Sequence, residues 1–319
     1  MRNDRKKRRR KQRAIMKRAV ASKAVAEKIA ESVRKQKLIA ENYCAKWREI
    51  CKQSKYRRQI AMNVNAEKSN SVSDVNNICP NELTPLDENT CIGTGTFGEC
   101  TLKLYKRFNL VVLEKQLSTS NLKAVINEAK CMNTLTHPNI PQLSGVQTTC
   151  KPYALIMEFI GEDMESSTVH QLLEETSPKG SPLLTPEWIS VCVDIVEAAN
   201  HIHSKGYLHC DLKTNNVLVL KKRGFVIDFG KVCLTTKPTA KKYTSFYHYI
   251  APEVLRGQPV SSSSDVFSLG VIISTIAKTL GNKSMYSVGR QCKDTKPQVR
   301  PSLPTLITLL QGIIEKDNS

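Results

Sequence analysis

The sequence predicts an α+β fold of two lobes, the first rich in β-strands and the second in α-helices, preceded by a basic helical extension. Short runs of apolar and β-branched residues, such as 110–113 and 154–157, follow residue 89 and indicate strands. Beyond residue 185, apolar residues recur at helical spacing instead, as they do over 188–203. The extension is set apart by charge, because residues 1–60 hold 22 Lys and Arg against 5 Asp and Glu, whereas the rest of the chain holds 26 against 24.

We divide the chain into an extension over residues 1–60, a linker over 61–88 and a folded domain over 89–315. The linker is rich in Asn and Ser and contains the first two prolines of the chain, Pro80 and Pro85. Residues 14–56 lack both Gly and Pro, which predicts one long helix. That helix has little apolar surface, so it is either a solvated, partly disordered arm or a docking segment.

The positive charge of residues 1–60 predicts an anionic partner, which is nucleic acid, an acidic membrane or a protein. The basic run over residues 5–11 is typical of a nuclear localisation signal and equally of a solvated tail. The 11 cysteines form no C-x-x-C pair, which favours reduced thiols in an intracellular protein. No secretory signal and no apolar run of about 18 residues is present, so we expect no transmembrane segment and a cytoplasmic or nuclear location, or both.

A glycine-rich string opens the strand-rich part at Gly93, Gly95 and Gly98. Glycines allow the backbone to approach phosphate groups closely and to direct its amides toward them. The string also occurs in dinucleotide-binding folds and by chance, but here a strand follows it, whereas a dinucleotide-binding fold places a helix there.

A lysine in a strand and a glutamate in a helix follow the glycine-rich string. Lys115 ends an apolar strand, and Glu128 lies in the helical stretch after it. A strand lysine directed at the α- and β-phosphates is held in place by a glutamate on a facing helix. Both residues are common on surfaces, so the pair gains weight only from the motifs that follow.

The most specific signal is H-x-D-x-K-x-x-N over residues 209–216, with Asp228-Phe-Gly following on apolar flanks. Phosphoryl transfer requires in-line positioning of a hydroxyl and neutralisation of phosphate charge. Asp211 can accept the hydroxyl proton, and Lys213 can stabilise the transferred group. Asn216 and Asp228 offer the oxygen ligands that Mg²⁺ prefers.

With these motifs the chain resembles the eukaryotic protein kinases over about residues 89–313. Ala251-Pro-Glu253 is similar to the end of the family's activation segment, Asp265 begins a stretch similar to its central helix, and Arg300 resembles the arginine that pairs with Glu253. The resemblance implies a bilobal kinase fold with an N-lobe over 89–160 and a C-lobe over 161–315, with ATP and Mg²⁺ as cofactors and proteins as substrates.

The resemblance also implies a nucleotide site. Met157 stands at the gatekeeper position, and the backbone of Glu158 and Ile160 is expected to bind adenine. The full set of expected nucleotide contacts is Gly93, Gly95, Gly98, Cys100, Leu113, Lys115, Met157, Glu158, Ile160 and Leu218.

The branch of the family is indicated by two features. Lys213 resembles Ser/Thr enzymes, whereas residues 291–303 look like the tyrosine-kinase and tyrosine-kinase-like branches. A tyrosine-kinase-like Ser/Thr enzyme reconciles them. Phe246, where Ser/Thr kinases commonly have Thr, keeps Tyr or dual specificity open.

Two substitutions depart from the family pattern. Cys210 replaces the Arg that many kinases place before the catalytic Asp, so phosphorylation of the activation segment is not expected to be the main on-switch. Leu113 stands where a small Ala usually meets adenine, and overpacking there costs on the order of 1–3 kcal/mol. A pseudokinase scaffold with little or no phosphotransfer is therefore the alternative to an active enzyme.

Overall fold

The computed structural model describes residues 75–86, 91–95, 98–117, 121–179 and 182–317, all within one folded unit. The predicted extension over residues 1–60 and its helix lie outside these described residues.

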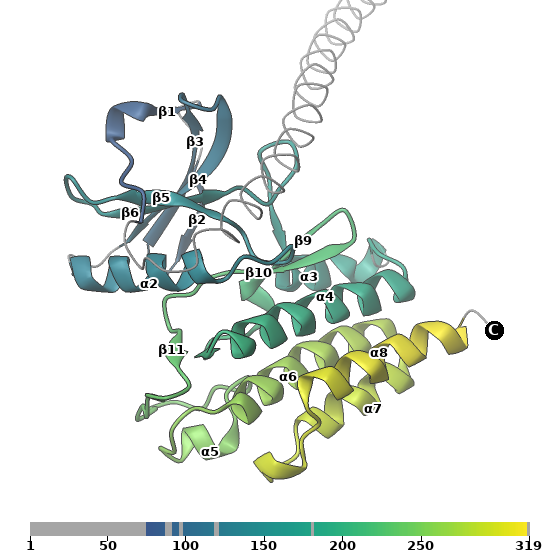
Figure 1. Cartoon of the computed structure of the whole chain (residues 1–319). Helices are drawn as coiled ribbons and strands as arrows, with labels where there is room; N and C mark the ends of the chain where they lie inside the picture. Colours follow the sequence, from purple (N-terminus) through teal and green to yellow (C-terminus); the bar gives the residue numbers. More distant parts are fainter. Residues whose placement is uncertain (1–74, 87–90, 96–97, 118–120, 180–181, 318–319) are drawn as a thin grey trace, which may run out of the picture. The chain divides into compact units, whose positions relative to one another are not determined.

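The first half of this unit is an antiparallel sheet of six strands (Figure 1). Two short strands pair with the same edge of β3, and β4, β6 and β5 follow on its other side. The strands are β1 (Leu83–Pro85), β2 (Cys91–Gly95), β3 (Gly98–Tyr105), β4 (Leu110–Leu117), β5 (Leu143–Gln147) and β6 (Ala154–Glu158). The strands predicted over 110–113 and 154–157 are thus confirmed.

The described end of the predicted linker, residues 75–86, belongs to this lobe, so that part of the prediction is wrong. Asn77 bridges to Val146 of β5, and β1 pairs with β3. Ile78 is fully buried in a small core against β4 and β6. The Asn and Pro residues resemble a linker, but the apolar side chains between them bury enough surface to fix the segment against the sheet.

Helix α2 (Leu122–Thr134) lies along the sheet beside β5 (Figure 1). The side chain of Asn121 accepts a hydrogen bond from the Lys123 amide and so caps its first turn. Val125, Ala129 and Met132 recur at helical spacing and face the core. Glu128 lies on this same buried face, which carries its carboxylate toward the sheet.

The second half is helical, as predicted (Figure 1). Its helices are α3 (Val169–Lys179), α4 (Thr185–Ser204), α5 (Pro252–Leu255), α6 (Ser262–Leu280), α7 (Lys283–Cys292) and α8 (Leu303–Asp317). Short strands accompany them: β9 (Val217–Leu220) pairs with β10 (Arg223–Val226) and β7 (Ser167–Thr168), and β8 (Tyr207–Leu208) pairs with β11 (Cys233–Leu234). Short 3₁₀ turns lie at η2 (Thr214–Asn216) and η3 (Pro297–Val299) in this half, and at η1 (Pro80–Glu82) just before β1 in the first half.

Helix α6 is the central element of the helical half. Ser261 and Ser264 cap its start reciprocally, since each side chain accepts the other's amide. Gly281 ends it at φ 66°, a left-handed conformation that glycine adopts without strain. Among the described residues α6 is the one helix long and apolar enough to cross a membrane, but 72% of it is buried inside the protein, as expected of a core helix.

Candidate active site

Lys115 lies between two carboxylates that come from distant parts of the chain. Strand β4 directs its side chain toward α2, where the Nζ atom lies 3.0 Å from Glu128 Oε1 and 2.8 Å from Asp228 Oδ1. All three side chains are largely buried. The predicted pair of Lys115 and Glu128 is therefore brought together, and Asp228 joins it.

The charges of this triad depend on one another. Burial alone would lower the pKa of Lys115, but Glu128 and Asp228 outweigh it and raise the pKa. Burial alone would likewise raise the pKa of Asp228, whereas the Lys115 ammonium lowers it. Burial raises the pKa of Glu128, Lys115 offsets this only in part, and the negative charge of Asp228 adds to the rise. Lys115 thus stays a cation fixed between two carboxylates.

Asp211 lies at the centre of a second cluster. Its carboxylate is 1% exposed and accepts hydrogen bonds from Lys213 Nζ at 3.2 Å, Asn216 Nδ2 at 3.1 Å and Lys231 Nζ at 2.8 Å. Asn216 also donates to the Asp211 carbonyl at 2.8 Å, which fixes the loop between them. The predicted residues Asp211, Lys213 and Asn216 therefore meet in space.

The backbone before Asp211 is held by a buried carboxylate on α6. Asp265 accepts the His209 amide at 2.8 Å and the Cys210 amide at 2.9 Å, and it also contacts His203 Nε2 at 2.9 Å. Burial alone would raise the pKa of Asp265, but the His203 hydrogen bond leads the contacts that lower it. Asp265 therefore holds the loop as an anion.

His209 connects this loop to the segment that carries Asp228. Its Nδ1 accepts the Asp211 amide, and its Nε2 lies 3.2 Å from the Ile227 carbonyl. A carbonyl can only accept, so Nε2 carries the proton. Burial lowers the pKa of His209 and keeps the ring neutral. The ring also contacts Phe229 at a centroid distance of 5.2 Å, so Asp211 and Asp228 are positioned through one residue.

The predicted Mg²⁺ ligands fit that ion chemically. The Asn216 amide nitrogen donates to Asp211, which leaves Oδ1 as the atom able to bind a cation. Asp228 contributes carboxylate oxygens, and hard oxygen ligands are the ones that Mg²⁺ prefers. In the part of the chain that the structure describes, no cluster of three or more His, Cys, Asp or Glu side chains is suited to a metal. A site of one amide and one carboxylate matches Mg²⁺, which takes its remaining ligands from phosphates and water.

The predicted glycine-rich segment is a β-hairpin in which Gly95 pairs with Gly98. Gly98 has φ 140°, and a Cβ atom placed there would lie 1.6 Å from the Gln116 carbonyl oxygen. Only glycine therefore fits at position 98. Gly93 and Gly95 lie in β2 of the same hairpin, so all three predicted glycines belong to one β2–β3 hairpin.

The other predicted nucleotide contacts gather on neighbouring strands. Cys100 is the cross-strand partner of Lys115, and Leu113 is the partner of Met157. The Glu158 amide at the end of β6 donates to the Gln142 carbonyl at 2.8 Å. Ile160 is buried two residues later, and Leu218 is half-buried in β9 of the other lobe.

Three functional candidates were not predicted from the sequence. Lys231 directly follows Asp228-Phe-Gly and makes the shortest contact to the Asp211 carboxylate. Burial alone would lower the pKa of Lys231, but the hydrogen bond and charge of Asp211, together with Tyr249 and Tyr243, raise it. The ring of Tyr249 lies 5.7 Å from Lys213 Nζ. Asp265 was recognised only as the start of a helix. Its single acidic charge in an apolar helix is the signal that could have revealed it, because a buried carboxylate needs partners.

Comparisons with known proteins agree with this geometry. The sequence model of the protein kinase domain matches residues 86–318. The dual specificity testis-specific protein kinase 1 of Mus musculus is 32% identical over 205 residues, which cover 60% of this chain and 31% of the mouse protein. The serine/threonine-protein kinase CTR1 of Arabidopsis thaliana is 27% identical over 259 residues, covering 70% of this chain and 31% of the plant protein.

A third relative, the serine/threonine/tyrosine-protein kinase HT1 of Arabidopsis thaliana, is 30% identical over 181 residues, covering 56% of this chain and 45% of that protein. The matched part thus spans less than half the length of each of these relatives. Members of the matched family generally use ATP and Mg²⁺. Since the family model covers well over half of the chain, the chain belongs to the protein kinase domain family.

Proposed function

We propose that this chain transfers the γ-phosphoryl group of ATP, in the presence of Mg²⁺, to Ser or Thr hydroxyls of protein substrates. The arrangement of Asp211 carries the proposal. Its carboxylate is almost fully buried, yet it is surrounded by Lys213, Lys231 and Asn216. An acceptor for the hydroxyl proton is thus held next to cations that can neutralise a developing phosphate charge.

The cluster around Asp211 and the cluster around Lys115 have different roles in the reaction. Asp211 accepts the proton of the attacking hydroxyl, and Lys213 stabilises the transferred phosphoryl group. Lys115, held by Glu128, orients the α- and β-phosphates. Asn216 and Asp228 would hold Mg²⁺, which would neutralise charge between the phosphates.

Lys231 is assigned a second role beside Asp211. It contacts Oδ1, whereas Lys213 contacts Oδ2, so the two lysines approach the carboxylate from different oxygens. This fixes the rotation of the carboxylate. Lys231 is therefore a positioning residue for the proton acceptor.

Specificity for Ser and Thr is supported by Lys213 and by the Ser/Thr or dual-specificity names of the relatives. Phe246, where Ser/Thr kinases commonly have Thr, is 80% exposed. Phosphoamino-acid analysis of the product tests the choice. Phosphotyrosine as the main product would replace Ser/Thr specificity with Tyr specificity.

Activity is tested with the full chain, Mg-ATP and a generic protein substrate. Asp211→Asn keeps the shape of the side chain but removes its charge, and we expect phosphate incorporation to fall to background. Asp294→Asn is the matched control, because Asp294 is exposed and its carboxylate accepts the Lys296 amide, a contact that the Asn side-chain oxygen can keep. Absence of transfer by wild type and the control, with both proteins folded, would favour the scaffold instead.

The basic residues 1–60 are proposed to bind an acidic partner within the cell. Deletion of these residues should remove salt-sensitive binding to that partner without abolishing phosphotransfer. Nucleic acid, anionic vesicles and acidic protein are separate arms of this assay. Binding that is unchanged by the deletion, or by raising the salt, would contradict the proposal.

A further inference from the structure

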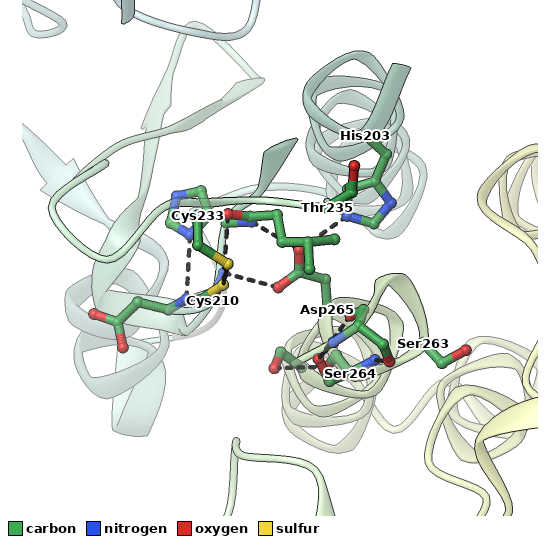
Figure 2. Close-up of polar contacts among 12 residues, drawn as sticks. His203, Cys210, Cys233, Thr235, Ser263, Ser264 and Asp265 are labelled. Atoms are coloured by element: carbon green, nitrogen blue, oxygen red, sulfur yellow. Dashed lines mark hydrogen bonds and ion pairs between the residues drawn. The ribbon is translucent and has the colours of Figure 1, made fainter. Parts of the chain in front are cut away.

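Two thiols face each other beside the active site. Cys210 Sγ lies 3.6 Å from Cys233 Sγ, and Figure 2 shows the two sulfur atoms next to each other, beside the Asp265 carboxylate. Cys210 directly precedes Asp211, whereas Cys233 lies in β11 between Asp228 and Glu253. The contact therefore joins the loop that holds the proton acceptor to the segment that leads away from Asp228.

The backbone is held in place at both Cys210 and Cys233, so the two side chains start from fixed positions. Cys210 has φ 65°, an uncommon conformation for a residue with a Cβ, and its amide is held by Asp265 at 2.9 Å. Cys233 pairs in register with Leu208 in the β8–β11 ladder. The sulfur of Cys210 also lies 3.5 Å from the Leu208 carbonyl oxygen. One short ladder thus places the two thiols against each other.

The two thiols differ in reactivity. Burial and the Asp265 carboxylate raise the pKa of the Cys210 thiol. The thiolate is the nucleophilic form, so Cys210 is a poor first attacker. Cys210 and Cys233 are both partly exposed, so an oxidant from solvent reaches either sulfur, and the poor nucleophilicity of Cys210 leaves Cys233 as the first attacker.

We propose that Cys210 and Cys233 form a reversible disulfide with a peroxide as oxidant, and that this bond slows phosphoryl transfer. The Cys233 thiolate attacks one oxygen of hydrogen peroxide, the O–O bond breaks, and the departing hydroxide takes up a proton to leave as water. The sulfur of Cys210 then attacks the resulting sulfenic acid, the S–O bond breaks, a second water leaves and Cys210 gives up its proton. Two thiols lose two electrons and two protons, and one peroxide is reduced to two waters.

The bond changes the geometry next to the proton acceptor. A disulfide requires an S–S distance of about 2.0 Å, so the sulfurs must move together by roughly 1.5 Å. That movement pulls on Cys210, whose amide Asp265 holds, and on Asp211, the next residue. A displacement on the order of 1 Å at a catalytic group is enough to slow a reaction severely. This part of the inference rests on the proposed function.

The test uses the full chain, fully reduced and then treated with hydrogen peroxide in the folded state. We expect a disulfide-linked peptide pair containing Cys210 and Cys233 by mass spectrometry after free thiols are alkylated. ADP formation should fall in proportion to the linked fraction and return with dithiothreitol. Cys233→Ser should keep the activity of the reduced protein and retain it under peroxide.

Cys131→Ser serves as the control, because Cys131 is buried in α2 and its replacement should leave both the linkage and the peroxide sensitivity in place. The proposal is overturned if peroxide oxidises the exposed Cys79 and Cys150 but leaves Cys210 and Cys233 unlinked. Linked protein with full activity would overturn it too, as would a Cys233→Ser protein that stays peroxide-sensitive. If reduced wild type has no activity, the proposed function fails instead, and the peptide linkage still decides whether the disulfide forms.

Discussion

Replacing Arg300 by Met should destabilise the helical lobe strongly. Its guanidinium side chain is 0% exposed and forms two parallel hydrogen bonds with Glu253, at 2.7 and 2.8 Å. It also donates to the carbonyls of Ser263 and Asp294. Met keeps most of the volume but leaves the Glu253 carboxylate buried without its cation. Breaking a buried pair in this way costs about 3–5 kcal/mol.

The assay is urea unfolding followed by tryptophan fluorescence, supported by thermal unfolding. For a domain of this size each kcal/mol corresponds to about 2–4 °C, so we expect the unfolding temperature to fall by about 6–20 °C. Arg256→Met is the matched control, since Arg256 is exposed, and it should change stability by less than about 0.5 kcal/mol. Adding Glu253→Gln to Arg300→Met should restore part of the loss, because the unpaired charge is gone. A loss below about 1 kcal/mol for Arg300→Met would refute the reasoning.

Three further outcomes are expected. Burial, together with the charges of His201 and Arg223, lowers the pKa of His137 from 6.5 to about 4. Between pH 4 and 6.5 the His137 ring is therefore protonated in the unfolded chain but not in the folded protein. Stability should fall as pH drops below about 6.5. In urea unfolding between pH 7 and 5, His137→Gln should lose less stability than wild type, by about 1 kcal/mol at most because water screens the half-buried ring. Leu113→Ala should tighten ATP binding about tenfold by calorimetry, since relieving about 1.4 kcal/mol of crowding gives that factor. Cys210 stands where many kinases have the arginine that binds a phosphorylated activation segment, so removing phosphate groups with a phosphatase should leave ADP formation unchanged.

Each of these outcomes has its own contradiction. If His137→Gln and wild type lost the same unfolding free energy between pH 7 and 5, the pH dependence of stability would come from a group other than His137. Weaker ATP binding by Leu113→Ala would show that this leucine supports the site and does not crowd it. A large fall in activity after phosphatase treatment would restore phosphorylation as the main switch.

Residues that act at fixed sequence spacing were predictable, and their contacts follow from the fold. The predicted pairing of Lys115 with Glu128 requires only a strand lysine and a helix that faces it, and the structure joins them at 3.0 Å. The predicted pairing of Arg300 with Glu253 is likewise observed, although 47 residues separate the two. The order of the motifs along the chain predicts such contacts, because each motif occupies one known place in the kinase fold.

Contacts that depend on local register were not predictable. The approach of Cys210 to Cys233 follows from the β8–β11 pairing and from the left-handed backbone at Cys210. Neither can be read from hydrophobic periodicity, since β8 and β11 contain two residues each. The same holds for Lys231, whose side chain contacts Asp211 although 20 residues separate the two.

The buried charges themselves argue for catalysis over a purely structural role. Lys115 and Asp211 are each enclosed by groups of opposite charge inside the protein. A buried ion pair contributes little net stability, and apolar residues of similar volume often serve a fold as well or better. A scaffold that only had to keep its shape would gain nothing from placing two lysines on one carboxylate and two carboxylates on one lysine. Groups with these charges are instead what phosphoryl transfer requires.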